Sequence, residues 1–277
     1  MSERISLGKR SYLAVPPSAP GPWPVVMMLH GAGGTAAWTL TETRWGERVE
    51  PGGFLLVLPE ATRPDPGSPP GFLANPQVWN DGAADGRPPR PAVDDVAFLD
   101  AVLDDLGQRY PIDPARISIT GFSNGAAMTF RYASERSERL AAIAPVAGHC
   151  NVEPRPARPV PTLYLVGRED PLVRCARGDR HAMGAVRVAR PSVSGTLTKW
   201  AAALGCSTTP RLVGSDDGVT IEGYPGPVPF LAYTIDALGH HWPGGGGELL
   251  RRIAGPPSDR VEACRVIWDF FRRQTVN

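Results

Sequence analysis

The sequence predicts an α/β fold, with a mostly parallel central sheet covered by helices on both faces. Short, continuous apolar runs such as Val25–Leu29 and Phe54–Leu58 are typical of strands buried on both faces of such a sheet. These runs alternate with longer segments whose apolar residues recur at helical spacing, which is the order that βαβ units require. No shift in composition divides the 277 residues, so we expect a single catalytic domain over residues 1–277.

The first half of the chain alternates strands and helices around one long connection. The connection, Glu60–Pro91, is rich in proline, and a loop of this length in a compact domain is usually functional. Because it follows a buried strand, we expect it to form part of a substrate cleft. The expected strands are Arg10–Val15, Val25–Leu29, Phe54–Leu58 and Arg116–Thr120, and the expected helices are Ala36–Val49, Asp94–Tyr110 and Ala126–Glu135.

The second half continues the same alternation. Two further strands are followed by a helix, then by a strand pair and a C-terminal helix with an aromatic apolar face. The strands are Leu140–Val146 and Thr162–Val166, the helix is Ser192–Leu204, the strand pair is Val219–Tyr224 with Phe230–Ile235, and the last helix is Arg260–Arg273.

Charge and hydropathy exclude several classes of protein. A net charge of +1 lacks the basic excess of a nucleic-acid-binding protein. The longest apolar runs are far shorter than the roughly 18 residues of a membrane span, so we expect no membrane partner. The N-terminal residues MSERISLGKRSYL contain no apolar stretch of a secretory signal. We therefore expect a cytoplasmic protein, or a secreted one if a leader has been removed.

The four cysteines form no CxxC pair, so we expect neither a zinc ribbon nor a thioredoxin-type site. Free thiols are the default in a reducing compartment. The alternative is a disulfide that involves Cys150, Cys175 or Cys206. The four are Cys150, Cys175, Cys206 and Cys264.

The segment Gly121–Gly125 reads GFSNG, which matches the pattern G-x-S-x-G. An apolar strand precedes it and an alanine-rich helical segment follows it, as in the nucleophile elbow that exposes a serine at a sharp strand-to-helix turn. The two glycines fit because larger side chains would collide with the neighbouring strand and helix. Ser123 is the candidate nucleophile, and a glycine-rich turn with a surface serine is the alternative.

A serine hydroxyl needs a base, because it is a weak nucleophile at neutral pH. In α/β-hydrolases the acid and then the histidine follow the serine along the chain. The late pair His240 and His241 fits this order. His30 precedes the serine, and no strand-end acid lies between the serine and His149. His181 lies in an arginine-rich loop, where we expect a solvated residue. One member of the pair should face Ser123, since adjacent residues usually point in different directions.

The acid should follow the strand Thr162–Val166. Asp170 in the sequence GREDP is the best candidate and Glu169 is the second choice. Its role would be to orient the histidine and stabilise the imidazolium. Two later acids are weaker candidates, Asp179 and Asp216.

An oxyanion hole is expected from two backbone N–H groups. One belongs to the residue after the nucleophile, Asn124, and the other to the glycine-rich turn HGAGGT, where either Ala32 or Gly33 fits. This turn lacks the Gly-Lys-Ser/Thr ending of a phosphate-binding loop, so we do not expect nucleotide binding.

With these residues in place, the chain resembles the α/β-hydrolase esterases of the poly(3-hydroxybutyrate) depolymerase and feruloyl esterase group. The resemblance rests on LHGAGGTAAW, on the stretch VDDVAFLDAVLDDLGQRYPIDPARISITGFSNGAAM, and on VGREDPL, KWAAALGC and GHHWPGG. It implies an α/β-hydrolase fold with Ser123 as nucleophile, Asp170 as acid and His240 as base. It implies no metal and no organic cofactor.

We therefore predict a serine esterase that forms an acyl-enzyme on short-chain acyl, hydroxyalkanoate or hydroxycinnamoyl esters. Its partner would be a small-molecule or oligomeric ester, and the sequence leaves the oligomeric state open. Three residues are expected to contact the substrate: Trp79, His241 and Trp242. The alternatives are a serine peptidase of the prolyl-oligopeptidase type and a non-catalytic binding protein on a hydrolase fold.

Overall fold

The computed structural model describes residues 2–71, 74–84, 92–173, 192–249 and 251–276. Within these residues, a single sheet of ten strands runs in the order β1-β2-β4-β3-β5-β6-β7-β10-β9-β8. The six strands from β4 to β10 are parallel, and antiparallel strands complete both edges. The strands are β1 Glu3–Leu7, β2 Arg10–Val15, β3 Trp23–Leu29, β4 Leu55–Pro59, β5 Ile112–Phe122, β6 Ala142–Val146, β7 Thr162–Gly167, β8 Arg211–Asp216, β9 Val219–Gly223 and β10 Phe230–Ile235.

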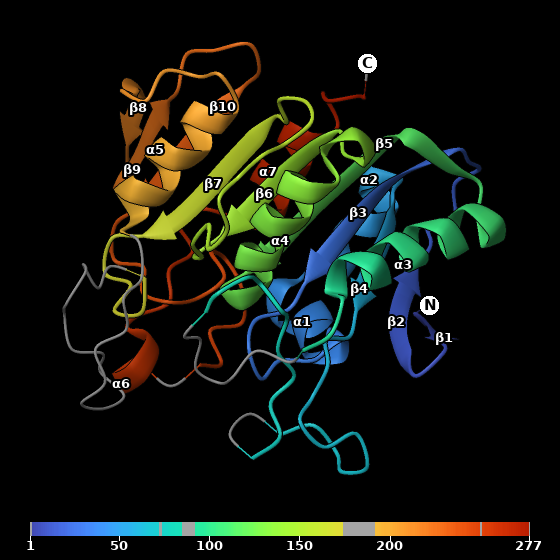
Figure 1. Ribbon diagram of the computed structural model, residues 1–277. Coiled ribbons are helices and arrows are strands. Elements are labelled where there is room, and N and C mark those ends of the chain that lie inside the picture. Colours follow the sequence, from blue (N-terminus) through green and yellow to red (C-terminus); the bar gives the residue numbers. More distant parts are fainter. Residues whose placement is uncertain (1, 72–73, 85–91, 174–191, 250, 277) are drawn as a thin grey trace.

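Helices cover both faces of this sheet (Figure 1). The helices α3, α4 and α5 lie on one face, and α2 and α7 lie on the other. This arrangement confirms the predicted mostly parallel sheet with a helical layer on each side. The helices are α1 Ala36–Thr43, α2 Gly46–Gly52, α3 Asp95–Arg109, α4 Asn124–Glu135, the 3₁₀ helix η1 Ser137–Arg139, α5 Val193–Ala203, α6 Arg251–Ala254 and α7 Ala263–Phe271.

The central strands β3 and β4 are almost entirely buried and apolar. Every residue of β4 is buried, and so are six of the seven residues of β3. The parallel strands end at the lower edge of the sheet in Figure 1, where the long connections gather. Ligands of open α/β sheets bind beyond these carboxyl ends, so this edge is the place to look for a site.

One predicted helix is broken in the structure. The segment Ala36–Val49 forms two helices, because Arg44 adopts a left-handed conformation with φ of 60° and ends α1. The chain resumes helical structure at Gly46 in α2. The apolar pattern alone could not locate this break, since Arg44 has no sequence signature of a helix end such as glycine.

Two edge strands and two short helices, η1 and α6, were not predicted. The strands β1 and β8 carry few buried residues, so neither forms the apolar run that marks a central strand. The helix α6 has only four residues. In contrast, the antiparallel pair β9 and β10 was predicted correctly.

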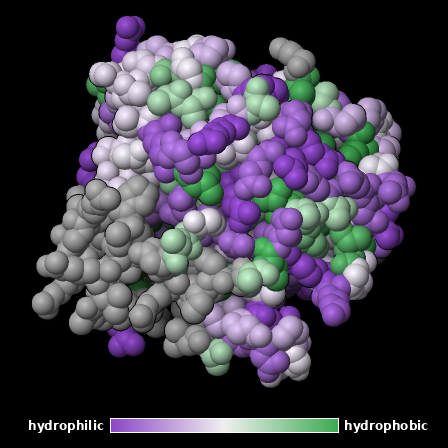
Figure 2. Space-filling model, in the orientation of Figure 1, coloured by the Kyte–Doolittle hydropathy of each residue, from purple (hydrophilic) through white to green (hydrophobic). Residues whose placement is uncertain are grey.

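The surface facing the viewer in Figure 2 is mostly hydrophilic, with small separate apolar areas. Among the described residues, the exposed large hydrophobic side chains are Leu212 and Val213, at 68% and 62% exposure. Both lie on the edge strand β8, where Val213 is an extra residue in a β-bulge opposite β9. No helix in the described ranges is long and apolar enough to span a membrane.

Candidate active site

Ser123 lies at the turn between β5 and α4 in a strained backbone conformation, with φ of 56° and ψ of −113°. The flanking glycines leave no room for a side chain. A Cβ on Gly121 would lie 2.4 Å from the carbonyl oxygen of Gly125, and a Cβ on Gly125 would lie 2.2 Å from that of Leu29. The sequence GFSNG therefore folds as the sharp strand–turn–helix that holds a serine at the carboxyl edge of the sheet.

The structure brings Ser123, His240 and Asp170 together from three different strand ends. The Nε2 atom of His240 lies 2.9 Å from Ser123 Oγ, and its Nδ1 lies 2.7 Å from Asp170 Oδ2. The ring of His240 packs against Phe122 with 4.9 Å between ring centroids. Since Nδ1 faces a carboxylate, it carries the proton, and Nε2 is free to accept the proton of the serine hydroxyl.

Asp170 is fully buried at the end of β7. Its Oδ1 accepts hydrogen bonds from the backbone N–H groups of Leu172 and Val173, at 2.8 and 2.9 Å. Burial raises the pKa of Asp170, but the charge and hydrogen bond of His240, with these two N–H groups, bring it below its ordinary value. The carboxylate is therefore ionised at neutral pH and can stabilise an imidazolium.

The neighbouring histidine, His241, points away from the serine. Its Nε2 lies 3.0 Å from the carbonyl oxygen of Gly255, and only 1% of the residue is exposed. Trp242 is buried as well, beside Phe122. The expectation that His241 and Trp242 contact the substrate is wrong for this conformation, because both side chains are enclosed by protein.

The expected oxyanion donors differ in their availability. Asn124 is the first residue of α4, so its backbone N–H has no acceptor within the helix. The N–H of Gly33 donates to the carbonyl oxygen of Gln77 at 2.8 Å, which corrects the expectation that Gly33 could serve. Ala32, half-buried in the same turn, is the remaining candidate from the two that the sequence allowed.

Trp79 lies near the elbow but packs inside the protein. Its backbone N–H donates to Asn124 Oδ1 at 2.8 Å, and its indole N–H donates to the carbonyl oxygen of His30 at 2.9 Å. The residue is fully buried. The expectation that Trp79 is an apolar substrate contact is therefore corrected: it anchors the long loop against the elbow and the turn.

Sequence reasoning missed the part that side chains around the nucleophile play in holding this loop. The amide of Asn124 donates to Asp81 Oδ2 at 2.7 Å, in addition to its contacts with Trp79. Asp81 is almost fully buried although its side chain is a carboxyl group. The signal available in the sequence was the asparagine inside GFSNG. We had expected a role only for its backbone N–H and none for its side chain.

The other candidates that the sequence offered are not part of the chain of hydrogen bonds from Asp170 to Ser123. Glu169 is exposed, and Asp216 is exposed on the edge strand β8. His30 and His149 are buried near their own backbone or helix partners, Gly31 and Thr196. The described cysteines are buried free thiols, Cys150, Cys206 and Cys264. Cys175, Asp179 and His181 lie outside the described residues.

In the described part of the chain, no three His, Cys, Asp or Glu side chains come together as a metal site. The site is instead a chain of hydrogen bonds at the carboxyl edge of a parallel sheet. This arrangement suits nucleophilic attack on a carbonyl carbon, with the base oriented by a buried carboxylate.

Comparisons with known proteins agree with this fold. The dienelactone hydrolase family matches residues 10–185. A protein of Nocardia uniformis subsp. tsuyamanensis, NocK, which is named as an esterase, is 27% identical over 92% of this chain and 76% of its own. Feruloyl esterase B of Piromyces equi is 28% identical, over 49% of this chain but only 25% of its own length. The acetyl xylan esterase from Aspergillus awamori superposes with a TM-score of 0.62 and 13% identity, over 87% of this chain and 94% of that one.

The structural likeness supports the fold, and the family match covers more than half of the chain. The predicted resemblance to α/β-hydrolase esterases, feruloyl esterases included, is thereby confirmed. The chain belongs to the dienelactone hydrolase family and is a carboxylic ester hydrolase of the α/β-hydrolase type.

Proposed function

We propose that this chain is a serine esterase with Ser123 as nucleophile, His240 as general base and Asp170 as the residue that orients the histidine. The observation that carries the proposal is the unbroken path of hydrogen bonds from Asp170 Oδ2 through the His240 ring to Ser123 Oγ, at 2.7 and 2.9 Å. Such a path is short enough for proton transfer without rearrangement.

In the first half-reaction, Ser123 Oγ attacks the carbonyl carbon of the ester while His240 Nε2 takes the hydroxyl proton. The resulting oxyanion accepts hydrogen bonds from the backbone N–H groups of Asn124 and Ala32. As the tetrahedral intermediate collapses, the bond to the alcohol oxygen breaks, and His240 returns its proton to that oxygen. The products are a free alcohol and an acyl group on Ser123.

In the second half-reaction, water attacks the acyl carbon and gives its proton to His240 Nε2. The bond to Ser123 Oγ then breaks and the serine recovers the proton, so the carboxylic acid leaves and the enzyme is regenerated. Asp170 stays ionised throughout, since it stabilises the imidazolium by its charge and does not accept the proton.

We propose small carboxylic esters as substrates, in particular short-chain acyl, hydroxyalkanoate and hydroxycinnamoyl esters. The hydroxycinnamoyl group is suggested by the similarity to a feruloyl esterase, and the hydroxyalkanoate by the sequence motifs around the nucleophile and base.

The experiment compares wild type with Ser123→Ala on p-nitrophenyl acetate, p-nitrophenyl butyrate, methyl ferulate and a soluble hydroxybutyrate oligomer. We expect Ser123→Ala to lose at least about 10³-fold in kcat/KM on every accepted ester and to resist a fluorophosphonate probe. The matched control is Ser118→Ala, a buried serine on the same strand β5, which should keep both activity and labelling.

Full ester turnover by Ser123→Ala would refute the assignment of the nucleophile. Faster cleavage of matched p-nitroanilides than of esters would instead favour a peptidase. A wild type that neither turns over esters nor reacts with the probe would favour a non-catalytic binding protein.

A further inference from the structure

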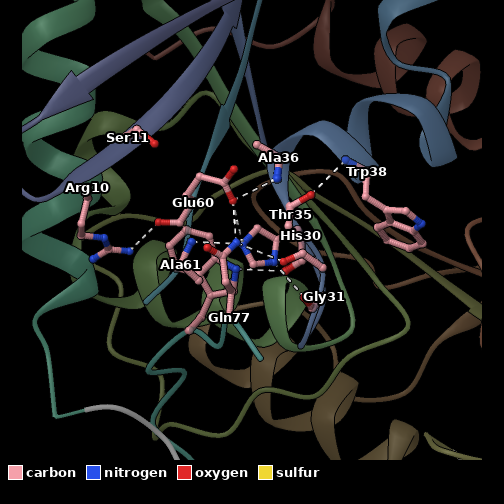
Figure 3. Close-up of polar contacts among 12 residues, drawn as sticks. Arg10, Ser11, His30, Gly31, Thr35, Ala36, Trp38, Glu60, Ala61 and Gln77 are labelled. Carbon is pink, nitrogen blue, oxygen red and sulfur yellow. Dashed lines mark hydrogen bonds and ion pairs between the residues drawn. The ribbon is translucent and has the colours of Figure 1, made fainter. Parts of the chain in front are cut away.

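The turn that contains Ala32 is held by a buried polar network that the proposed chemistry does not use directly. Figure 3 shows Glu60 and Gln77 pointing towards the turn between His30 and Ala36. Both residues come from the connection after β4, not from the turn itself. Any displacement of these side chains would therefore be transmitted to the backbone that carries an oxyanion donor.

Gln77 contacts the turn at two adjacent residues and is 2% exposed. Its backbone carbonyl accepts the N–H of Gly33 at 2.8 Å, directly after Ala32 in the chain. Its side-chain amide donates to the carbonyl oxygen of Gly34 at 3.2 Å. One residue thus holds the N–H of Gly33 and the carbonyl group of Gly34, the two residues that follow the proposed donor.

The same amide nitrogen donates to Glu60 Oε2 at 2.6 Å. This carboxylate oxygen also accepts the N–H of Ala36, the first residue of α1, at 3.1 Å. Hydrogen bonds to an ionised acceptor are about twice as strong as neutral ones. Glu60 therefore joins Gln77 to the far end of the turn, so that the turn is braced from its tip to the start of the helix.

The near end of the turn is held by His30, whose orientation is fixed by two hydrogen bonds. Its Nε2 accepts the N–H of Ala61 at 3.0 Å, so the ring proton resides on Nδ1, which donates to the carbonyl oxygen of Gly31 at 2.8 Å. Burial lowers the pKa of His30, which keeps the ring neutral in this tautomer.

The segment from Gln77 to Trp79 also reaches the second oxyanion donor. Trp79, two residues after Gln77, donates from its indole to His30 and from its backbone to the side chain of Asn124. One short segment therefore contacts the turn that carries Ala32 and the residue that follows the nucleophile. The relative position of the two donors depends on this segment.

We propose that Gln77 is a positioning residue for the oxyanion hole, whose side-chain amide holds the carbonyl group of Gly34 and the carboxylate of Glu60 so that the Ala32 N–H faces the reacting carbonyl. This inference rests on the proposed esterase function. Oxyanion contacts strengthen only in the transition state, so their misplacement lowers kcat more than it raises KM.

The decisive variant is Gln77→Met, which keeps the length of the side chain and removes both of its hydrogen-bond donations. Loss of a whole oxyanion donor costs about 10²–10³-fold in kcat, so a displaced donor should cost about 10–100-fold. KM for p-nitrophenyl butyrate should change by less than about threefold. The inhibition constant of a trifluoromethyl ketone with a matched acyl chain should rise by the same factor as kcat falls.

The matched control is Asn75→Leu, in the same loop. Asn75 is also a buried amide, but it donates only to carbonyls of its own loop, those of Asp65, Ser68 and Pro69. It should lower the midpoint of thermal unfolding without changing kcat or the affinity of the ketone. A milder second variant, Glu60→Gln, should lower kcat by a few-fold in the same direction, because it weakens a charge-assisted bond.

Fluorophosphonate titration counts the folded, reactive sites in each variant, so that partial unfolding does not count as a loss of kcat. The proposal is overturned if Gln77→Met keeps the wild-type kcat per site, if KM alone changes, or if Asn75→Leu loses as much kcat. Failure of the proposed function looks different, because the wild type itself would then show no ester turnover and no labelling.

Discussion

The strained backbone at Ser123 predicts that glycine at this position gives a more stable fold than alanine does. A non-glycine residue with φ of 56° and ψ of −113° lies in a sparsely populated region, which costs on the order of 1–3 kcal/mol. Glycine adopts such backbone angles without steric cost. We therefore compare two inactive variants, Ser123→Gly and Ser123→Ala, since alanine retains the Cβ that causes the strain.

Both variants lose the hydrogen bond from Ser123 Oγ to His240, so this contribution cancels in the comparison. Relative to alanine, glycine lowers the free energy of unfolding by about 0.5–1 kcal/mol, because it gives the unfolded chain more conformational freedom. The free energy of unfolding should then be higher for Ser123→Gly than for Ser123→Ala by about 0.5–2 kcal/mol.

The assay is urea denaturation at pH 7 followed by tryptophan fluorescence, with the midpoint and slope fitted for each variant. The control is Ala101→Gly at an exposed position in α3, where the backbone is helical and glycine should destabilise by about 1 kcal/mol. Opposite signs at the two positions are expected. A Ser123→Ala variant as stable as Ser123→Gly, or more stable, would refute the claim that strain is stored at the elbow.

Three further predictions concern the surrounding residues. Asp170→Asn should lower kcat by about 10⁴-fold, as expected when a histidine loses its orienting carboxylate. Because the folded pKa of Asp170 is lowered, its contribution to stability is present above its unfolded pKa of about 3.9 and is lost as pH falls through the lower folded value. Urea denaturation should show the advantage of wild type over Asp170→Asn shrinking as the pH falls below about 5, and a constant difference would contradict this. His240→Gln should abolish ester turnover. His241→Gln should keep kcat/KM within about threefold and lose about 1 kcal/mol of stability, because it loses the hydrogen bond to Gly255. Equal losses of turnover in the two variants would contradict the assignment of His240 as the base. Trp79→Phe should destabilise by about 1–3 kcal/mol through the lost indole hydrogen bond, with KM unchanged in steady-state assays, and a large rise in KM would restore its role as a substrate contact.

Much of this architecture could be predicted because central parallel strands have a strong local signature. The runs Val25–Leu29 and Phe54–Leu58 are buried on both faces, so their composition alone reveals them. The break at Arg44 could not be predicted, since a left-handed residue other than glycine leaves no such signature. The edge strand β8 could not be predicted either. Its residues are mostly exposed, so they form no apolar pattern that marks a strand.

The site shows the same division between local and tertiary information. The motif GFSNG and the order of acid and base along the chain led to Ser123, Asp170 and His240, whose side chains the structure brings into hydrogen-bond contact. The burial of Trp79 could not be predicted, because a tryptophan in a proline-rich loop has no periodicity that indicates the direction of its side chain. Only the packed structure shows that its indole is satisfied by a backbone carbonyl.

The bulge in β8 also bears on how this protein behaves when it is concentrated. An unpaired edge strand offers its backbone groups to any other extended chain, and this exposure is a common route to aggregation. The extra residue Val213 interrupts the regular spacing of those groups opposite β9. At the other edge, β1 presents Glu3 and Arg4 to solvent. The two edges of the sheet therefore oppose pairing with another chain by different means, β8 by its irregular shape and β1 by its charged side chains.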